Sequence, residues 1–248
     1  MKTKPKKNIK NLLPPDSIDS NTRMVLANAI YMNADWFSAF DAALTRKEPF
    51  HSQTGKVFQV NMMHRRNHFN YNETENLQIL EIPYKGNALS ILFILPKKIP
   101  PPTIPFQPIQ PIEKLLNEQN LNLWKKGMTY TNVQLFLPRF KFETSCQLGN
   151  QLKKMGMLTA FTPQADFGNI GSEDISIRDV YHKALVKVEE QGTEAAAATV
   201  TVNETSSMQV REEAPKFFMA NHPFIFIIQE KKYGTILFIG KFAEPSPV

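Results

Sequence analysis

The sequence predicts an α+β chain in which short β-strands dominate and a few helices lie at the flanks. Short apolar runs bounded by polar or proline-rich stretches recur along the chain, and such runs are typical of strands. Only two segments favour a helix. The chain has 248 residues, 42% of them hydrophobic, and no internal repeat or Gly/Ser linker divides it. It is therefore expected to form one domain with a sizeable buried core, residues 1–248.

Four strands are predicted in the first half of the chain. Residues 23–31 form a mixed apolar segment that continues to Trp36 and is expected to be a buried strand. Residues 57–63 and 77–83 have strand-like composition. Residues 89–96 (LSILFILP) are continuously apolar, which is the pattern of a strand covered on both faces.

The middle of the chain alternates between loop, helix and strand. Residues 97–111 are dense in proline, which excludes a helix or a central strand, so we expect a surface loop. A PxxP docking role is the alternative interpretation of this loop. Residues 112–126 are predicted to be helical, residues 133–144 alternate like a strand, and residues 145–157 are expected to hold a short helix ending near Gly156.

The last third contains two apolar strands and one ambiguous segment. Residues 218–229 and 233–242 are predicted strands joined by a polar turn at residues 230–232. Residues 189–202 read EEQGTEAAAATVTV. The alanines favour a helix, the Thr/Val alternation favours a strand, and a surface connection is the third reading. A segment with this ambiguity, hinged at Gly192, suggests a conformational switch.

Four sequence blocks, in this order, closely resemble the serpins, the serine-protease inhibitor family. They are NAIYM followed by Trp36, the DV-x-HKA segment, the E-x-GTEAAAAT hinge and the HPF-x-F block. The resemblance runs from about Lys10 to Pro245. It implies a serpin fold, with mixed sheets, flanking helices and an exposed reactive-centre loop at about residues 189–215.

The resemblance implies an inhibitor of serine proteases, a suicide substrate rather than an enzyme. A protease cleaves the loop, and the loop then inserts into the main sheet as a new strand. Glycine supplies backbone freedom at the hinge, and alanines supply side chains small enough to enter between strands. The hinge residues are Glu190, Gly192, Thr193, Glu194, Ala195, Ala196, Ala197, Ala198 and Thr199. The alternative is a non-inhibitory relative that acts as a binding, carrier or chaperone protein.

The resemblance also assigns residues around the slot that the loop would enter. Asn28 and His182 match the family's shutter, where polar side chains bridge the strands that must part. Trp36 matches the tryptophan where insertion begins. Each residue is equally well described as a satisfied polar group or a core aromatic. The strands that flank the slot are expected at residues 24–36 and 181–190.

Two reactive bonds are compatible with the loop. Counting forward from Gly192 by the usual family spacing gives Ser206-Ser207, which would suit an elastase-like protease with a small specificity pocket. Counting back from the HPF block instead gives a region around Met208 to Arg211. Arg211-Glu212 is therefore the alternative bond, and Arg211 would suit a trypsin-like protease. We favour Ser206-Ser207, because insertion depends on the distance from hinge to bond.

The resemblance begins where a usual serpin has already passed its early helices. The chain is therefore expected to be a fragment, the C-terminal two-thirds of the fold, without the N-terminal helices and two main-sheet strands. Large apolar faces should then be exposed. In this form we expect cleavage of the loop with impaired trapping.

Other chemistry and other partners are not predicted. The chain has no nucleophile-elbow, Walker, dinucleotide or HExxH motif, so no catalytic residue and no cofactor are expected. His64 and His68 lie four residues apart without a nearby acidic third ligand, so no metal site is expected. The lysine-rich start is interpreted as a solvated end; nucleic acid and membrane are not expected partners, and a glycosaminoglycan is unsupported.

Cysteine content and sequons bear on localisation. Cys146 is the single cysteine, so no internal disulfide forms. The opening residues are too polar for a signal peptide, yet the family resemblance leads us to expect a secreted, extracellular parent glycoprotein. Asn72 and Asn203 begin N-glycosylation sequons. Because Asn203 lies in the loop that must insert, we expect modification at Asn72 and a bare Asn203.

Overall fold

A computed structural model describes residues 12–15, 17–97, 109–171, 175–193 and 214–245 of the chain. The chain is organised as two compact units. Unit 1 comprises residues 1–32 and 141–187, and unit 2 comprises residues 33–140 and 188–248. The expectation of a single domain stays a prediction.

Unit 1 is built around two parallel strands. Strand β1 (Met24–Tyr31) pairs in parallel with β9 (Ile177–Val188), in a register that joins Asn28 to His182 and Tyr31 to Leu185. Strand β8 (Phe140–Gln147) pairs with β9, leading into helix α3 (Gly149–Lys154) and the 3-10 turn η2 (Thr159–Phe161). Gly156, with φ of 100°, ends α3 as expected.

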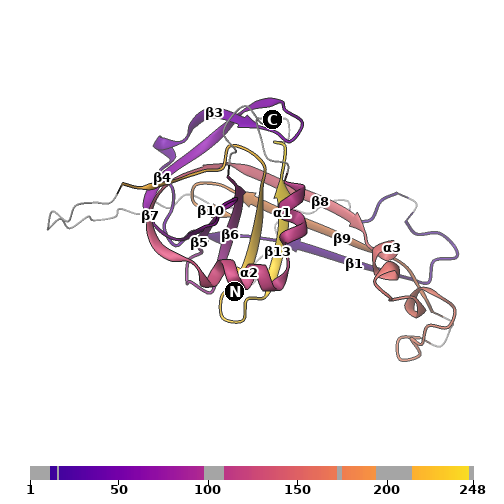
Figure 1. The fold of residues 1–248 in the computed structure, drawn as a ribbon. Helices are drawn as coiled ribbons and strands as arrows, with labels where there is room; N and C mark the ends of the chain where they lie inside the picture. Colours follow the sequence, from indigo (N-terminus) through magenta and orange to yellow (C-terminus); the bar gives the residue numbers. More distant parts are fainter. Residues whose placement is uncertain (1–11, 16, 98–108, 172–174, 194–213, 246–248) are drawn as a thin grey trace. The chain divides into compact units, whose positions relative to one another are not determined.

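Unit 2 contains an eight-stranded sheet in the order β11-β7-β4-β5-β6-β12-β13, with β3 beside β4 (Figure 1). Its strands are β3 (Arg46–His51), β4 (Val57–Glu73), β5 (Leu77–Pro83), β6 (Leu89–Pro96), β7 (Thr129–Pro138), β11 (Lys216–Met219), β12 (Phe224–Glu230) and β13 (Ile236–Phe242). Unit 2 also holds the short strands β2 (Ala34–Asp35) and β10 (Gly192–Thr193), the turn η1 (Ala42–Leu44) and the helices α1 (Gln110–Leu115) and α2 (Glu118–Lys126).

Both faces of the central strands in unit 2 are covered. On one face, Ile112 of α1 and Leu121 and Trp124 of α2 pack in one cluster with Ile79 and Ile227 of the sheet. On the other face lie the rings of Phe93, Phe140, Phe224, Phe226 and Phe242. This double covering explains why β6 is continuously apolar, and it confirms the prediction for residues 89–96.

Several predicted elements are shorter or longer than the sequence indicated. The helix predicted at 112–126 is broken, because Asn117 caps α2 by accepting a hydrogen bond from the Asn120 N–H. The strand predicted at 133–144 ends at Pro138, and β8 starts at Phe140. The strand predicted at 218–229 is two strands, since residues 220–223 leave the sheet.

The strand predicted at residues 57–63 instead continues to Glu73. Its register with β7 and then β5 is unbroken, so His64 and His68 lie within one continuous strand. Each histidine has an aromatic neighbour. His64 lies edge-on to Phe136 and its Nε2 is 2.9 Å from Glu48, and the ring of His68 stacks on Tyr130.

The expectation that residues 23–31 form a buried strand is wrong in its burial. Residues 26–29 of β1 are exposed, and Leu26 keeps 44% of its surface accessible. Within the described residues β1 pairs only with β9, so one of its edges is open. This exposure agrees with the expectation that apolar surface would be left uncovered.

Candidate functional site

The base of the predicted loop forms a short strand of its own. After β9 the chain makes a tight turn in which Glu189 and Gly192 exchange two backbone hydrogen bonds, of 2.8 and 3.2 Å. It then turns back as β10. Residues 194–213 follow, and they lie outside the described residues.

Strand β10 lies between the end of β9 and β2. Thr193 pairs antiparallel with Val188 on one side and with Ala34 on the other, and Gly192 pairs with Asp35. The chain thus begins a strand between β9 and β2, running antiparallel to β9. The hinge predicted at Gly192 is the residue where this reversal occurs.

Gly192 is required by sterics at this position. Its φ is 156°, and a Cβ atom there would collide with the carbonyl oxygen of Ala34 and lie 2.5 Å from the Asp35 Cα. Both obstacles are backbone atoms, which cannot rotate away as a side chain can. Only glycine allows β10 to approach β2 this closely.

Residues 36–40, which we call the hinge clamp, hold three successive carbonyl groups of the loop base. The indole N–H of Trp36 donates to the Glu189 carbonyl at 2.8 Å. The backbone N–H of Phe40 donates to the Glu190 carbonyl at 2.8 Å, and that of Trp36 to the Gln191 carbonyl at 2.9 Å. The Trp36 ring is buried and stacks on Tyr84, so Trp36 is both a core aromatic and a contact of the hinge.

The carboxylate of Glu190 is buried, and its Oε1 accepts hydrogen bonds from two side chains. Arg139 donates to Oε1 from Nε at 2.7 Å and from a terminal nitrogen at 2.5 Å, and the Thr45 hydroxyl donates to the same oxygen at 2.6 Å. Burial by itself would raise the pKa of Glu190, but the hydrogen bonds from Arg139 and Thr45 outweigh it and hold the pKa below its ordinary value. The carboxylate is therefore ionised at neutral pH and ties the loop base to Thr45, just before β3, and to Arg139, just after β7.

The far end of the loop leads into an ionic anchor on β11. Lys216 donates to the Glu73 Oε1 at 2.7 Å, and Lys97 lies 3.2 Å from the other oxygen. Hydrogen bonds, first of all the one from Lys216, lower the pKa of Glu73 to about 2. Gln78 also donates to the Phe217 carbonyl at 2.9 Å. The described residues that flank 194–213 on both sides thus make charged contacts.

The predicted shutter residues lie side by side in unit 1. His182 Nδ1 and Asn28 Oδ1 are 3.0 Å apart, and the two residues are directly paired across β1 and β9. The alternative reading made them buried polar groups. Asn28 is in fact exposed and His182 half-buried, so burial does not account for the pair.

The other predicted loop residues are outside the described part of the chain. They are Glu194, Ala195, Ala196, Ala197, Ala198, Thr199, Asn203, Ser206, Ser207, Arg211 and Glu212. The other glycosylation candidate, Asn72, is half-buried, and its Nδ2 donates to the Trp124 carbonyl at 2.9 Å. A Cβ on Gly127 would lie 2.6 Å from that nitrogen. Modification of Asn72 stays a prediction, and it requires this crowded contact to open.

Arg139 and Thr45 are site residues that sequence reasoning missed. Arg139 occupies the one-residue gap between β7 and β8, where the predicted strand was thought to continue. A break next to Pro138, followed by a basic residue, was the available signal. Thr45 carried no signal, because its role depends on a contact with a residue far along the chain.

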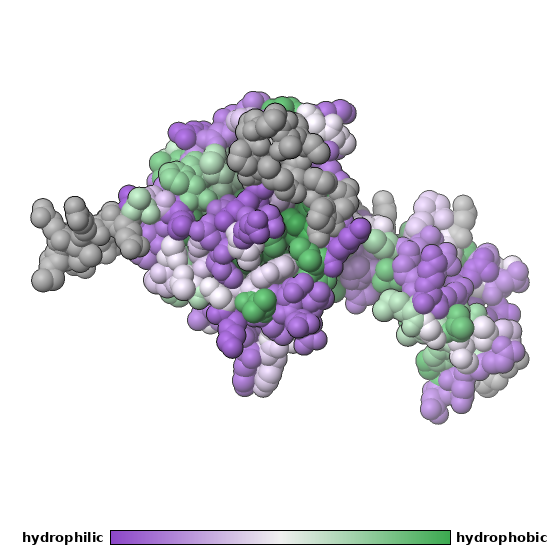
Figure 2. Space-filling model, viewed as in Figure 1, coloured by the Kyte–Doolittle hydropathy of each residue, from purple (hydrophilic) through white to green (hydrophobic). Residues whose placement is uncertain are grey.

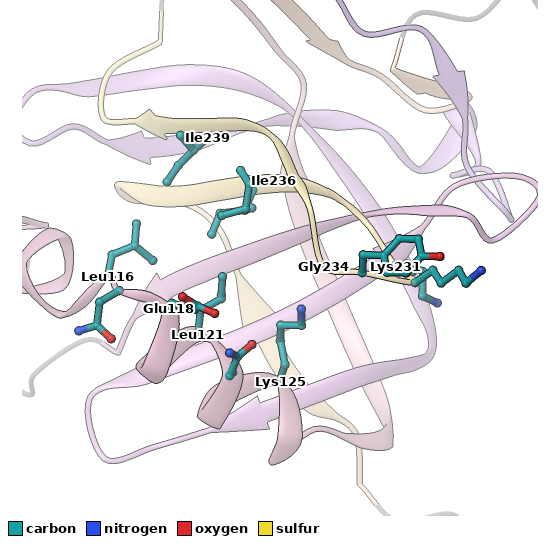
Figure 3. A pocket seen from close by; sticks show the side chains of 13 residues that line it. Leu116, Glu118, Leu121, Lys125, Lys231, Gly234, Ile236 and Ile239 are labelled. Carbon is teal, nitrogen blue, oxygen red and sulfur yellow. The ribbon is translucent and has the colours of Figure 1, made fainter. Parts of the chain in front are cut away.

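A cavity of about 710 Å³ lies in unit 2 between α2 and the β12–β13 hairpin. Figure 3 shows Leu121 and Lys125 on α2 across from Ile236 and Ile239 on β13. Lys231 and Lys232 line its rim. Its lining therefore combines an apolar floor with several cations. Figure 2 shows apolar surface beside α1 and β13, where Ile236 and Ile239 are about half exposed.

The described ranges bear on two further kinds of site. No group of three or more His, Cys, Asp or Glu side chains there could hold a metal ion. No helix there is long and apolar enough to cross a membrane.

Comparisons with known proteins agree on one family. A family model described as Serpin (serine protease inhibitor) matches residues 1–245. An uncharacterized serpin-like protein of Thermococcus kodakarensis is 42% identical over 90% of this chain and 50% of its own length. Serpin B4 of Homo sapiens is 41% identical over 96% of this chain and 60% of its own length. The chain thus spans about half of the first relative and three fifths of the second.

Solved structures with this fold include proteins with different roles. Native protease nexin-1 with heparin aligns with a TM-score of 0.81 and 29% identity, over 96% of this chain and 62% of that one. Human thyroxine-binding globulin complexed with its hormone aligns with a TM-score of 0.82 and 25% identity, over 97% of this chain and 60% of that one.

Proposed function

The chain belongs to the serpin family, and on that premise we propose that it inhibits a serine protease by offering residues 194–213 as bait and inserting them as a strand after cleavage. The observation that carries the proposal is the position of Thr193 between Val188 and Ala34. This pairing supports the proposal, because it would be the first rung of an inserted strand. The next residues would continue along β9, and β1 and β9 would have to separate to admit them.

The strand registers give this path a specific end point. Ala34 and Val188 flank Thr193, and Asn28 and His182 pair directly. The members of the two pairs are separated by the same number of residues along the chain. Continuing residue by residue from Thr193, an antiparallel strand would bring Thr199 between Asn28 and His182. We infer that insertion parts these two side chains and that the Thr199 hydroxyl takes a place between them.

The composition of the loop supports the same path. Residues 195–198 are alanines, so the four residues that would enter after Glu194 have little bulk and almost no side-chain entropy to lose. Charged or large residues at these positions would block entry between two paired strands. The sequence therefore favours an inhibitor over a family member that cannot insert its loop.

The direct test is formation of a covalent complex. The chain is incubated with trypsin-like and elastase-like serine proteases, and the products are separated in denaturing detergent. We expect a band at the mass of one protease plus the chain without its released C-terminal peptide, and no such band with a protease whose active-site serine is chemically blocked. Cleavage without any stable complex, for every protease in the panel, would contradict the proposal.

One relative bears on the choice of target. A relative from Xenopus laevis, 37% identical over 96% of this chain, is named leukocyte elastase inhibitor. We propose Ser206-Ser207 as the reactive bond, with Arg211-Glu212 as the alternative, and an elastase-like target. Mass spectrometry of the released C-terminal peptide decides, because a peptide beginning at Glu212 would replace this assignment with a trypsin-like target.

The efficiency of trapping is a separate proposal. We retain the expectation that the loop of this chain is cleaved more often than it traps a protease. The ratio of complex to cleaved chain measures this, and a ratio near one complex per cleavage would contradict it.

A second candidate function rests on the cavity beside α2. Its apolar floor and the cations Lys125, Lys231 and Lys232 fit an amphipathic aromatic anion, which would make the chain a small-molecule carrier. A fluorescent naphthalenesulfonate probe tests this. Saturable binding that weakens in Lys125→Gln, but not in the control Lys153→Gln of α3, would support it.

A further inference from the structure

Arg65 stands out as a half-buried cation that the proposed function does not yet use. It lies in the middle of β4, and its guanidinium carbon is 5.8 Å from the centre of the Phe40 ring and 5.3 Å from that of Phe69. A terminal nitrogen donates to the Ser38 carbonyl. No carboxylate among the described residues pairs with it.

The charge of Arg65 is costly to keep in this place. Burial lowers the pKa of Arg65 to about 10, which still leaves the guanidinium protonated at neutral pH. A methionine would fill similar space without desolvating a charge. Compared with a methionine, the guanidinium therefore adds its attraction to the two rings and its hydrogen bond to Ser38.

Two of these three contacts belong to the hinge clamp. Ser38 and Phe40 are in residues 36–40, and the Phe40 N–H holds the Glu190 carbonyl. The Phe40 ring also meets the Trp36 ring edge-on at 6.3 Å. Trp36 also stacks on Tyr84, whereas Arg65 contacts the Ser38–Phe40 half of the clamp.

We propose that Arg65 is a positioning residue, which holds the hinge clamp on the loop base and so keeps the first rung of the inserting strand in register. This role rests on the proposed function. Without Arg65, Phe40 would release the Glu190 carbonyl, and the turn that aims Thr193 between Val188 and Ala34 would lose one of its three fixed carbonyls. Insertion would then start from a less ordered base and proceed more slowly.

The variant Arg65→Met tests the role against a matched control, Arg66→Met. Arg66 is the next residue of β4 and is exposed on the opposite face. Amide hydrogen exchange of residues 36–40 is measured first. We expect exchange about tenfold faster in Arg65→Met and unchanged in Arg66→Met, as loss of a partly desolvated cation–π contact predicts. Equal exchange in the two variants would overturn the proposal.

Insertion itself is followed in a Trp124→Phe background, where Trp36 is the only tryptophan. The loop is nicked with a non-target protease, and Trp36 emission reports the arrival of the strand. We expect the change to be several-fold slower in Arg65→Met than in Arg66→Met. Arg65→Lys, which keeps the cation, should recover part of the rate, and it serves as the test if Arg65→Met does not fold.

The outcomes separate this inference from the proposed function. If the parent inserts its loop and all three variants insert at the same rate, the role of Arg65 is wrong while the proposed function stands. If the nicked parent shows no insertion, the proposed function fails, and the role of Arg65 falls with it.

Discussion

At the scale of single residues, Gly192 is the position with the least tolerance. Any Cβ there meets backbone atoms of Ala34 and Asp35, so even alanine must displace β2 or β10. We expect Gly192→Ala to destabilise the chain by about 1–3 kcal/mol, the cost of a strained backbone contact. It should also reduce the fraction of protease trapped while the loop is still cleaved.

The matched control for this prediction is Gly168→Ala. A Cβ on Gly168 meets only the flexible Asp166 side chain, at 3.3 Å. Denaturant unfolding and the complex-to-cleaved ratio are compared for both variants. Equal effects of the two substitutions would show that the close approach of β10 to β2 is unimportant.

Glu190 gives the site a defined pH dependence. Its folded-state pKa is below the ordinary value of 4.5, so the stabilisation from its carboxylate is fully present above that value. It is lost as the pH falls through the lowered folded pKa. We expect Glu190→Gln to cost about 2 kcal/mol at pH 7, as for a lost charge-assisted hydrogen bond, and much less in strong acid.

The control for Glu190 is the exposed Glu75. Unfolding of Glu190→Gln and Glu75→Gln is measured from pH 7 down to pH 2. The difference between the Glu190→Gln variant and the parent should shrink as the pH falls, whereas Glu75→Gln should track the parent throughout. A difference that is constant with pH would mean that Glu190 acts by packing and not by its charge.

At the scale of elements, the central prediction concerns the pairing of β1 with β9. An inserting strand must separate them, so a covalent bond between them should block trapping. Ile30 and Ala184 are direct partners, close enough for a disulfide. In a Cys146→Ser background, oxidised Ile30→Cys/Ala184→Cys should be cleaved without trapping, and reduction should restore the complex.

A disulfide elsewhere controls for the bond itself. Ile227 and Ile239 are partners across β12 and β13, away from the insertion path. An Ile227→Cys/Ile239→Cys variant should trap equally well oxidised and reduced. If the β1–β9 disulfide also leaves trapping unchanged, the loop does not insert between these strands.

The strands and helices also show how much of the fold could be predicted from the sequence. Apolar runs predicted β5 and β6 with their observed bounds, because burial on both faces leaves a continuous signal. The sequence did not predict the breaks inside two longer segments, one helical and one extended. Asn117 and Pro138 interrupt segments whose apolar periodicity continues on both sides, so only their capping and backbone chemistry marks the ends.

Only those site residues that lie in a distinctive local stretch of sequence could be predicted. Gly192 and the alanines stand out in any reading of the chain, and family motifs pointed to Trp36, Asn28 and His182. The partners Arg139, Thr45 and Arg65 did not stand out. Their importance comes from contacts across long sequence separations, which a single sequence does not record.

At the scale of the whole molecule, the chain is shorter than its relatives and leaves apolar surface uncovered. The relatives compared above are longer than this chain, which spans 50–60% of them. Strand β1 has an open edge among the described residues, and Leu26, Ile236 and Ile239 are each more than two fifths exposed. Surface of this kind promotes association, so measurements of trapping should be made at low protein concentration.

The most direct test of the central claim, that the cleaved loop becomes a strand, is the thermal stability of the whole chain before and after cleavage. A non-target protease nicks residues 194–213, and unfolding of intact and nicked chain is followed by circular dichroism. An added central strand contributes several kcal/mol, so the account predicts a rise in the midpoint of about 10 °C or more. A nicked chain that melts at or below the temperature of the intact one would contradict it.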